Sequence, residues 1–125
     1  SLLKVLVVDD IKMNQIIIQQ MLRKYEIEPT IAGNGVEGLE LASDNEYDIV
    51  FMDCRMPVMD GFEATRKLRD KGYTKSIVAL TAGTTVEERE RCIKSGMDDI
   101  LSKPYTSNDL KEMLKKWGIA RVTVA

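Results

Sequence analysis

The sequence predicts an α/β fold, an open sheet of parallel strands with helices on both faces. Short and almost continuous apolar runs occupy residues 2–8, 49–52 and 77–80, and such runs are typical of strands that are buried on both faces. Stretches of helical length separate the runs, so that strand and helix alternate five times along the chain. This alternation predicts right-handed crossovers between parallel strands.

Two weaker strands complete the expected sheet. Ile31 and Ala32 follow Pro29, and a proline fits a strand at the edge of a sheet because it has no N–H to donate to a neighbouring strand. Ile100 and Leu101 form the fifth candidate, which is very short.

Apolar residues repeat at helical spacing in the first and last of the expected helices. Those of the first helix are Met13, Ile17, Ile18, Met21 and Leu22, and those of the last are Leu110, Met113, Leu114 and Trp117. The residues suited to helix ends are Thr84 with Glu87, Asp60 with Glu63, Ser107, and Gly96. The two pairs have the spacing of a capping box, Ser107 is placed to cap the last helix, and Gly96 is placed to end the fourth.

Length and composition fit one ordinary globular domain. The 125 residues are enough for a core, and the formal net charge of -2 gives no sign of nucleic-acid or membrane binding. No apolar run approaches the roughly 20 residues of a membrane span. Cys54 and Cys92 stand in unrelated contexts, which favours reduced thiols and a cytoplasmic location. The sequence has no histidine, which excludes His-based triads and His-ligated metals.

We expect one domain over residues 1–117, with residues 118–125 as a tail or linker. The chain starts at Ser1 without methionine. That start suits a segment of a longer protein and equally suits a processed chain, and both interpretations stay open.

Five polar residues stand where the expected strands end. Asp9 and Asp10 directly follow the first strand, Asp53 ends the third, Thr81 ends the fourth and Lys103 follows the fifth. Ligands of open α/β sheets bind beyond the carboxyl ends of the strands, so we expect these side chains to meet in one shallow cleft. A single Asp-Asp or Lys-Pro pair is more often a turn or a loop. Their joint placement at successive strand ends is what indicates a site.

The three carboxylates of this cleft would repel one another unless a cation or a proton intervenes. Magnesium is the natural partner, because it prefers oxygen ligands and combines one or two carboxylates with phosphate oxygens. Lys103 adds a compact positive charge and Thr81 a hydroxyl donor. Together these groups suit an aspartyl-phosphate that forms through positioning and charge neutralisation.

The segments that carry these residues resemble the receiver domain of two-component response regulators, over nearly the whole chain. The similar segments are residues 7–10 (VVDD), 52–61 (MDCRMPVMDG), 79–82 (ALTA), 96–99 (GMDD) and 103–105 (KPY). Asn14 and the run MPVMDGFEAT are most similar to receivers attached to hybrid histidine kinases.

The resemblance implies a flavodoxin-like, doubly wound sheet of five parallel strands in the order 2-1-3-4-5, with two helices on one face and three on the other. It implies that Asp53 is the nucleophile that accepts a phosphoryl group, that Lys103 pairs with a phosphoryl oxygen, and that Thr81 bonds another oxygen on activation.

The resemblance also implies a magnesium site and a set of partners. Mg²⁺ would bind Asp10 directly, Asp9 largely through water, the Asp53 carboxylate and the backbone carbonyl of Arg55. The donor would be a phosphohistidine of a histidine kinase or a histidine phosphotransfer protein, and phosphorylation would switch partner interactions. The domain would be no enzyme beyond its own phosphoryl uptake and hydrolysis and would contact neither nucleic acid nor membrane directly. A weak homodimer is compatible with this pattern, and the sequence leaves the oligomeric state open.

Three positions depart from the family pattern or vary within it. Ile100 stands where the family often has an aromatic residue that turns inward as Thr81 moves, so we expect Ile100 to pack in the core and no Thr–Tyr coupled switch. Tyr105 fills a different family position. Arg55 and Gly83 occupy two variable positions beside the phosphoryl group and offer no group to position an attacking water. Arg55 either tunes the phosphoryl lifetime or is simply solvated.

Three other functions fit parts of the pattern. A hydrolase of the haloacid dehalogenase type also uses an aspartyl nucleophile, but it needs a general acid where Arg55 stands. A flavodoxin-like cofactor binder needs a phosphate-cradling loop after the first strand, where Asp9 and Asp10 repel anions. A pseudo-receiver, the same fold used as a phosphorylation-independent docking module, is the alternative that remains.

Overall fold

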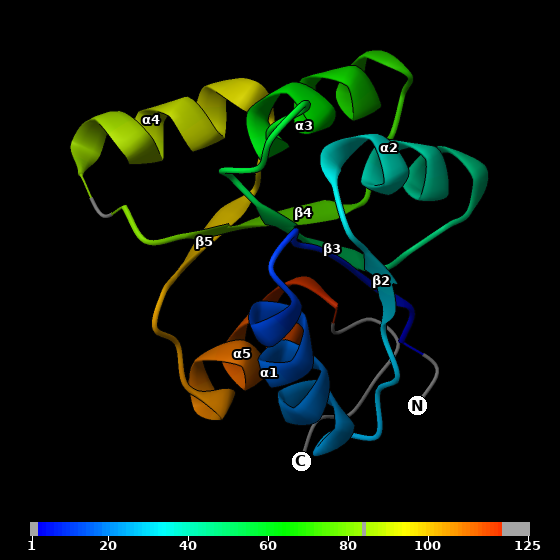
Figure 1. Ribbon diagram of the computed structural model, residues 1–125, viewed down its shortest axis with the longest axis vertical. Helices are drawn as coiled ribbons and strands as arrows, with labels where there is room; N and C mark the ends of the chain where they lie inside the picture. The colour runs from blue at the N-terminus through cyan, green and yellow to red at the C-terminus, as the bar shows by residue number, and fades with distance from the viewer. Residues whose placement is uncertain (1–2, 84, 119–125) are drawn as a thin grey trace.

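Five strands and five helices alternate along the chain in the computed structural model, which describes residues 3–83 and 85–118. The strands are β1 (Val5–Val8), β2 (Thr30–Ala32), β3 (Ile49–Asp53), β4 (Ser76–Thr81) and β5 (Asp99–Ser102). The helices are α1 (Lys12–Arg23), α2 (Gly35–Asp44), α3 (Gly61–Asp70), α4 (Val86–Ser95) and α5 (Ser107–Trp117). Every strand pair is parallel and the order is β2-β1-β3-β4-β5 (Figure 1), which confirms the predicted fold.

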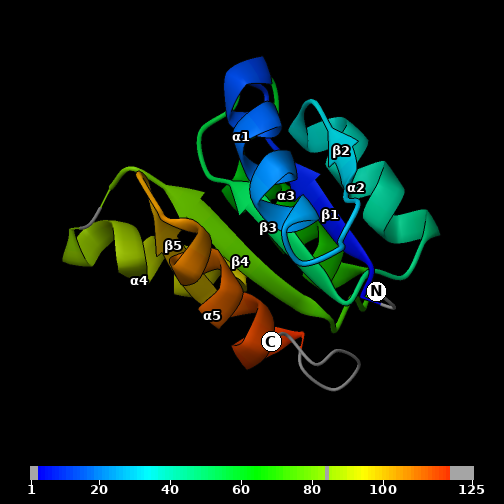
Figure 2. The same ribbon diagram turned by 90° about the horizontal axis from the view of Figure 1, so that it is seen from below.

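The helices form two layers, one on each face of the sheet (Figure 1 and Figure 2). Successive strand residues point to opposite faces, so each strand supplies two separate cores. In β1, Leu6 and Val8 pack under α2, α3 and α4, whereas Val5 and Val7 pack against α1 and α5. This division of three helices and two is the predicted one. None of the helices that the structure describes is long and apolar enough to cross a membrane.

The strand boundaries explain where the polar residues come to lie. The β2 strand follows Pro29 and lies at the edge of the sheet, as expected. Asp53 and Thr81 are the last residues of β3 and β4. The first strand is shorter than the predicted apolar run, whose residue 2 lies outside the described part of the chain. Strand ends therefore carry the candidate site residues, as the sequence predicts.

The helix ends agree with the predictions at two positions and differ at two. Asp60 caps α3 by accepting a hydrogen bond from the Glu63 N–H, and Gly96 ends α4 with φ of 109°. Thr84, the predicted cap of α4, lies outside the described residues, and Thr85 caps that helix. The prediction of Ser107 as a cap is wrong. Thr106 caps α5 instead, because Asp109 stands three residues later and completes a capping box with it.

The apolar pattern of α1 is only partly buried. Ile18 and Leu22 are buried in the core between α1, α5 and the sheet. Met13 is 63% exposed and Ile17 is 41% exposed. Met13 lies in the first turn of α1, which follows the end of β1 at the carboxyl edge of the sheet, and Ile17 lines a groove with Lys103 and Tyr105. The pattern in α5 is confirmed, with Leu110 and Leu114 buried.

Candidate functional site

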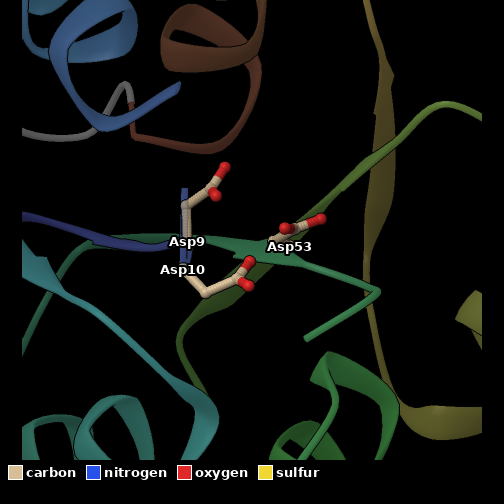
Figure 3. Close-up of side chains that lie close together, drawn as sticks. All are labelled: Asp9, Asp10 and Asp53. Atoms are coloured by element: carbon tan, nitrogen blue, oxygen red, sulfur yellow. The ribbon is translucent and has the colours of Figure 1, made fainter. Parts of the chain in front are cut away.

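The polar residues predicted at the strand ends converge at the carboxyl edge of the sheet. Asp9 and Asp10 follow β1, and Asp53 ends the neighbouring strand β3. One carboxylate oxygen from each of the three lies within 4.8 Å of the others. Figure 3 shows the Asp10 side chain extending toward Asp53, with Asp9 on the side of α1 and α5. Parallel pairing of β1 with β3 is what brings these distant parts of the sequence together.

Lys103 places one ammonium group between two of these carboxylates. Its Nζ lies 3.4 Å from Asp53 Oδ1 and 3.5 Å from Asp9 Oδ2. The backbone N–H of Lys103 donates to the Thr81 carbonyl oxygen over 2.8 Å, which fixes the loop after β5 against the end of β4. Asp9 and Asp53 therefore share one lysine, and no ion pair of Asp10 occurs among the described residues.

The surroundings of Asp53 disfavour the ionised form of its carboxylate. Its side chain is buried, and this burial, more than any other effect, raises the pKa of Asp53 to about 6. The nearby Asp9 raises the pKa further, whereas Lys103 and a hydrogen bond from the Arg55 backbone oppose the rise. A cation bound at this carboxylate would therefore offset the free-energy cost of burying its charged form.

The donor set fits a hard divalent cation. Asp9 uses Oδ1 to accept the Ile11 N–H at 2.9 Å and Oδ2 to pair with Lys103. Asp10 Oδ1, by contrast, is shielded from solvent and has no hydrogen-bond partner among the described residues. A buried oxygen without a donor is costly unless something positive binds it. Asp10 is therefore the carboxylate most available to a metal, and Asp9 is committed to holding Lys103 and the chain.

The segment after β3 folds back onto Asp53. The Gly61 N–H donates to the Cys54 carbonyl oxygen at 3.1 Å. A Cβ atom at Gly61 would collide with the Asp53 carbonyl oxygen, so only glycine permits this close approach. Asp60, one residue earlier, caps α3. The Asp-Gly pair thus holds the start of α3 against the strand end that carries Asp53.

Thr81 makes contacts that the sequence did not predict. Its Oγ1 donates to Glu88 Oε2 at 3.1 Å and accepts the Gly83 N–H at 3.0 Å. The other Glu88 oxygen, Oε1, accepts from the Arg55 guanidinium at 2.6 Å. Glu88 is buried in the first turn of α4. Arg55 is therefore not merely solvated, although its side chain is 62% exposed.

Two residues close to Lys103 in the sequence, Ile100 and Tyr105, pack against opposite cores. Ile100 is partly buried against the core under α2, α3 and α4, which confirms that it packs there. Tyr105 packs against the opposite core, beside α1 and α5, and burial together with Asp9 and Asp53 raises the pKa of Tyr105 to about 12.

Comparison with known proteins identifies relatives of one kind. The family model described as "Response regulator receiver domain" matches residues 5–115. Hybrid signal transduction histidine kinase A of Dictyostelium discoideum is 40% identical over 121 residues, which cover 92% of this chain and 6% of that kinase. The chain thus spans only a small part of the length of this relative.

Solved structures agree with the sequence comparison. The receiver domain of a sensor histidine kinase from Pseudomonas aeruginosa PAO1, crystallised with magnesium coordinated in its active-site cleft, is 37% identical with a TM-score of 0.86. The match covers 92% of this chain and 96% of that one. A co-crystal of the Saccharomyces cerevisiae phosphotransfer protein Ypd1 and the receiver domain of Ssk1 matches with a TM-score of 0.89 and 30% identity, over 98% of this chain and 92% of that chain. The chain belongs to the receiver domain family of response regulators, and the kinase relatives described above are sensor and hybrid histidine kinases.

Proposed function

We propose that this receiver domain accepts a phosphoryl group from a phosphohistidine onto the Asp53 carboxylate, with magnesium bound in the same cleft. The observation that carries the proposal is the convergence of Asp9, Asp10 and Asp53 around Lys103 at the carboxyl edge of the sheet. Like charges beside a buried carboxylate destabilise the fold, so they do not serve a purely structural role. They do suit a phosphoryl acceptor that works with a bound cation.

Each residue of the cleft has a part in the proposed transfer. An Asp53 oxygen attacks phosphorus, the new phosphorus–oxygen bond forms, and the phosphorus–nitrogen bond to the donor imidazole breaks. Lys103 stands 3.4 Å from Asp53 and neutralises charge on the incoming group. Asp9 holds Lys103 in place. A magnesium ion bound by Asp10, Asp53 and the Arg55 carbonyl would supply further charge neutralisation at the phosphoryl oxygens.

The proposed donor is a histidine kinase or a histidine phosphotransfer protein that docks beside the cleft. A groove of about 380 Å³ adjoins Lys103, and its lining residues are Asn14, Ile17, Ala82, Lys103, Pro104 and Tyr105. Ile11 and Met13 precede Asn14 closely in the sequence and are 51% and 63% exposed. Exposed apolar side chains beside a charged cleft are typical of a surface that binds a partner. We place the protein in the cytoplasm, where the two free thiols, Cys54 and Cys92, would stay reduced.

Intact mass measurement after incubation with acetyl phosphate and magnesium tests the acceptor directly. We expect the mass of one phosphoryl group on the parent chain, and none when EDTA is present or in Asp53→Asn. Asp60→Asn is the matched control, because this carboxylate lies nearby but serves to cap α3. Uptake by Asp53→Asn equal to that of the parent would contradict the acceptor assignment. Failure of the parent to take up phosphate would favour the pseudo-receiver instead.

A further inference from the structure

Glu88 links three elements around the end of β4. Its carboxylate is buried, with the side chain 10% exposed, and the two oxygens have different partners. Oε2 accepts the Thr81 hydroxyl at 3.1 Å, and Oε1 accepts the Arg55 guanidinium at 2.6 Å. Thr81 is the last residue of β4, Arg55 follows β3, and Glu88 belongs to α4. One side chain thus connects the strand end, the loop after Asp53 and the start of the helix.

Capping of α4 does not require the Glu88 carboxylate to lie where it does. Thr85 and Glu88 have the spacing of a capping box, and Thr85 Oγ1 accepts the Glu88 N–H at 3.1 Å. In α5, the equivalent acid, Asp109, bends back to the backbone N–H of its own cap. The Glu88 carboxylate turns inward instead, to Thr81 and Arg55. Local helix capping therefore does not explain its position.

Gly83 provides the room for this arrangement. A Cβ atom at Gly83 would lie 3.0 Å from Glu88 Cγ and 3.3 Å from Glu88 Cδ. Those distances are tighter than ordinary van der Waals contact, so a Cβ atom at position 83 would require Glu88 to shift by a few tenths of an ångström. The Gly83 N–H also donates to Thr81 Oγ1. Gly83 thus donates a hydrogen bond to Thr81 and leaves space for the Glu88 side chain.

The Thr81 hydroxyl has one proton and can donate it to one acceptor at a time. In this structure that acceptor is Glu88. Leu80, next to Thr81, is the register partner of Asp53 on the adjacent strand. A phosphoryl group on Asp53 would bring three strongly accepting oxygens to this strand end, and these would compete with the Glu88 carboxylate for the same proton.

We propose that Glu88 is the resting partner of the Thr81 hydroxyl and a positioning residue that opposes phosphorylation. This inference rests on the proposed function of Asp53. Phosphorylation releases Glu88 from Thr81, and the Glu88–Arg55 ion pair carries that release to both the first turn of α4 and the loop after β3. Glu88 thereby sets how strongly the acceptor site holds a phosphoryl group.

Binding of beryllium fluoride with magnesium, titrated by calorimetry, measures this opposition without any transfer step, since the compound mimics an aspartyl-phosphate. We expect Glu88→Ala to bind it about tenfold more tightly than the parent, which corresponds to removal of one competing hydrogen bond. Glu88→Gln keeps an acceptor oxygen for Thr81 and should show a clearly smaller gain. Glu87→Ala removes the same charge from an exposed neighbour in the same helical turn and should bind like the parent.

A double-mutant cycle with Thr81→Ala separates the hydrogen bond from simple charge repulsion. In the Thr81→Ala background, Glu88→Ala should no longer tighten binding. An unchanged affinity in Glu88→Ala, or an equal gain with and without Thr81, would overturn the role of Glu88 while leaving Asp53 as acceptor. If the parent itself does not bind beryllium fluoride, the proposed function fails and this inference with it. Glu88→Gln, which keeps the size of the side chain, is the second variant if Glu88→Ala does not fold, and binding no tighter than that of the parent would then overturn the role of Glu88.

Discussion

At the scale of single residues, the burial of the Asp53 carboxylate lowers the stability of the fold. The cleft holds a carboxylate that is 4% exposed beside a second carboxylate, Asp9, that is 1% exposed. Lys103 is shared between the two, so it compensates neither fully. Burial of these charges lowers the stability of the fold, and a cation bound in the cleft would offset that loss.

The pH dependence of stability follows from the pKa of Asp53. Folding raises this pKa from 3.8 to about 6, so between those values the native state binds more protons than the unfolded state, and stability falls as pH rises. Asp53→Asn has no charge to bury. In EDTA at about pH 7.5 its melting temperature should therefore exceed that of the parent, and the difference should shrink below about pH 6 and vanish below about pH 4.

Thermal melts of both proteins across this pH range would check the prediction. Asp60→Asn, which keeps a capping oxygen at the start of α3, should show no comparable gain. A difference between Asp53→Asn and the parent that stays constant at every pH would mean that packing rather than charge accounts for the effect.

The sequence predicted some site residues and not others, for a physical reason. Asp9, Asp53 and Lys103 stand at strand ends, and strand ends in a parallel sheet meet at one edge whatever the details of packing. The inward turn of Glu88 depends on where α4 begins, and adjacent Thr84 and Thr85 each have a glutamate three residues later. Sequence alone cannot choose between these two caps. A start at Thr85 is what places Glu88 rather than Glu87 against Thr81.

At the scale of elements, Arg69 ties the end of α3 to two loops. Its guanidinium donates to the carbonyl oxygens of Gly96, Tyr73 and Lys75 over 2.8–2.9 Å. It also pairs with Asp98 at 2.9 Å, and the same Asp98 oxygen accepts the Ile77 N–H. The first aspartate of the GMDD segment therefore has a structural role, which fixes the turn between α4 and β5 to the start of β4.

Arg69→Ala should destabilise the domain by about 2–3 kcal/mol, because it leaves several partly buried acceptors without a donor. Urea unfolding followed by circular dichroism would measure the change. Arg66→Ala is the matched control, since Arg66 is exposed on the same helix and should alter stability by less than about 0.5 kcal/mol. Equal losses in the two variants would show that the Arg69 network contributes little.

The cap of α5 follows from the local sequence. Thr106 and Ser107 are adjacent hydroxyl residues, but only Thr106 has an acid three residues later, in Asp109. Application of the capping-box spacing to both would have favoured Thr106. The cap at Thr106 is thus encoded by a local signal, whereas the burial of α1 depends on tertiary packing that its own periodicity does not contain.

At the scale of the whole molecule, the fold leaves an apolar surface beside its charged cleft. The first turn of α1 and the loop after β5 meet at the carboxyl edge of the sheet, and the groove between them includes Lys103. Exposed apolar residues also occur on α4, where Ile93 is 57% exposed. These two patches lie on opposite faces of the sheet (Figure 1), because α1 and α4 belong to different layers.

The patch on α1 adjoins the groove that includes Lys103, so a phosphohistidine donor should depend on it. Met13→Asp should slow phosphoryl transfer from the cognate donor at least about tenfold, because a charge at the centre of an apolar contact removes its desolvation gain. Phosphorylation by acetyl phosphate should continue at the parent rate, since this small donor needs no docking surface.

Ile93→Asp changes a similarly apolar and exposed residue on α4 and should leave transfer unchanged. Single-turnover transfer assays would measure all three proteins. Equal transfer rates for Met13→Asp and the parent, or an equal slowing in Ile93→Asp, would place the docking surface elsewhere.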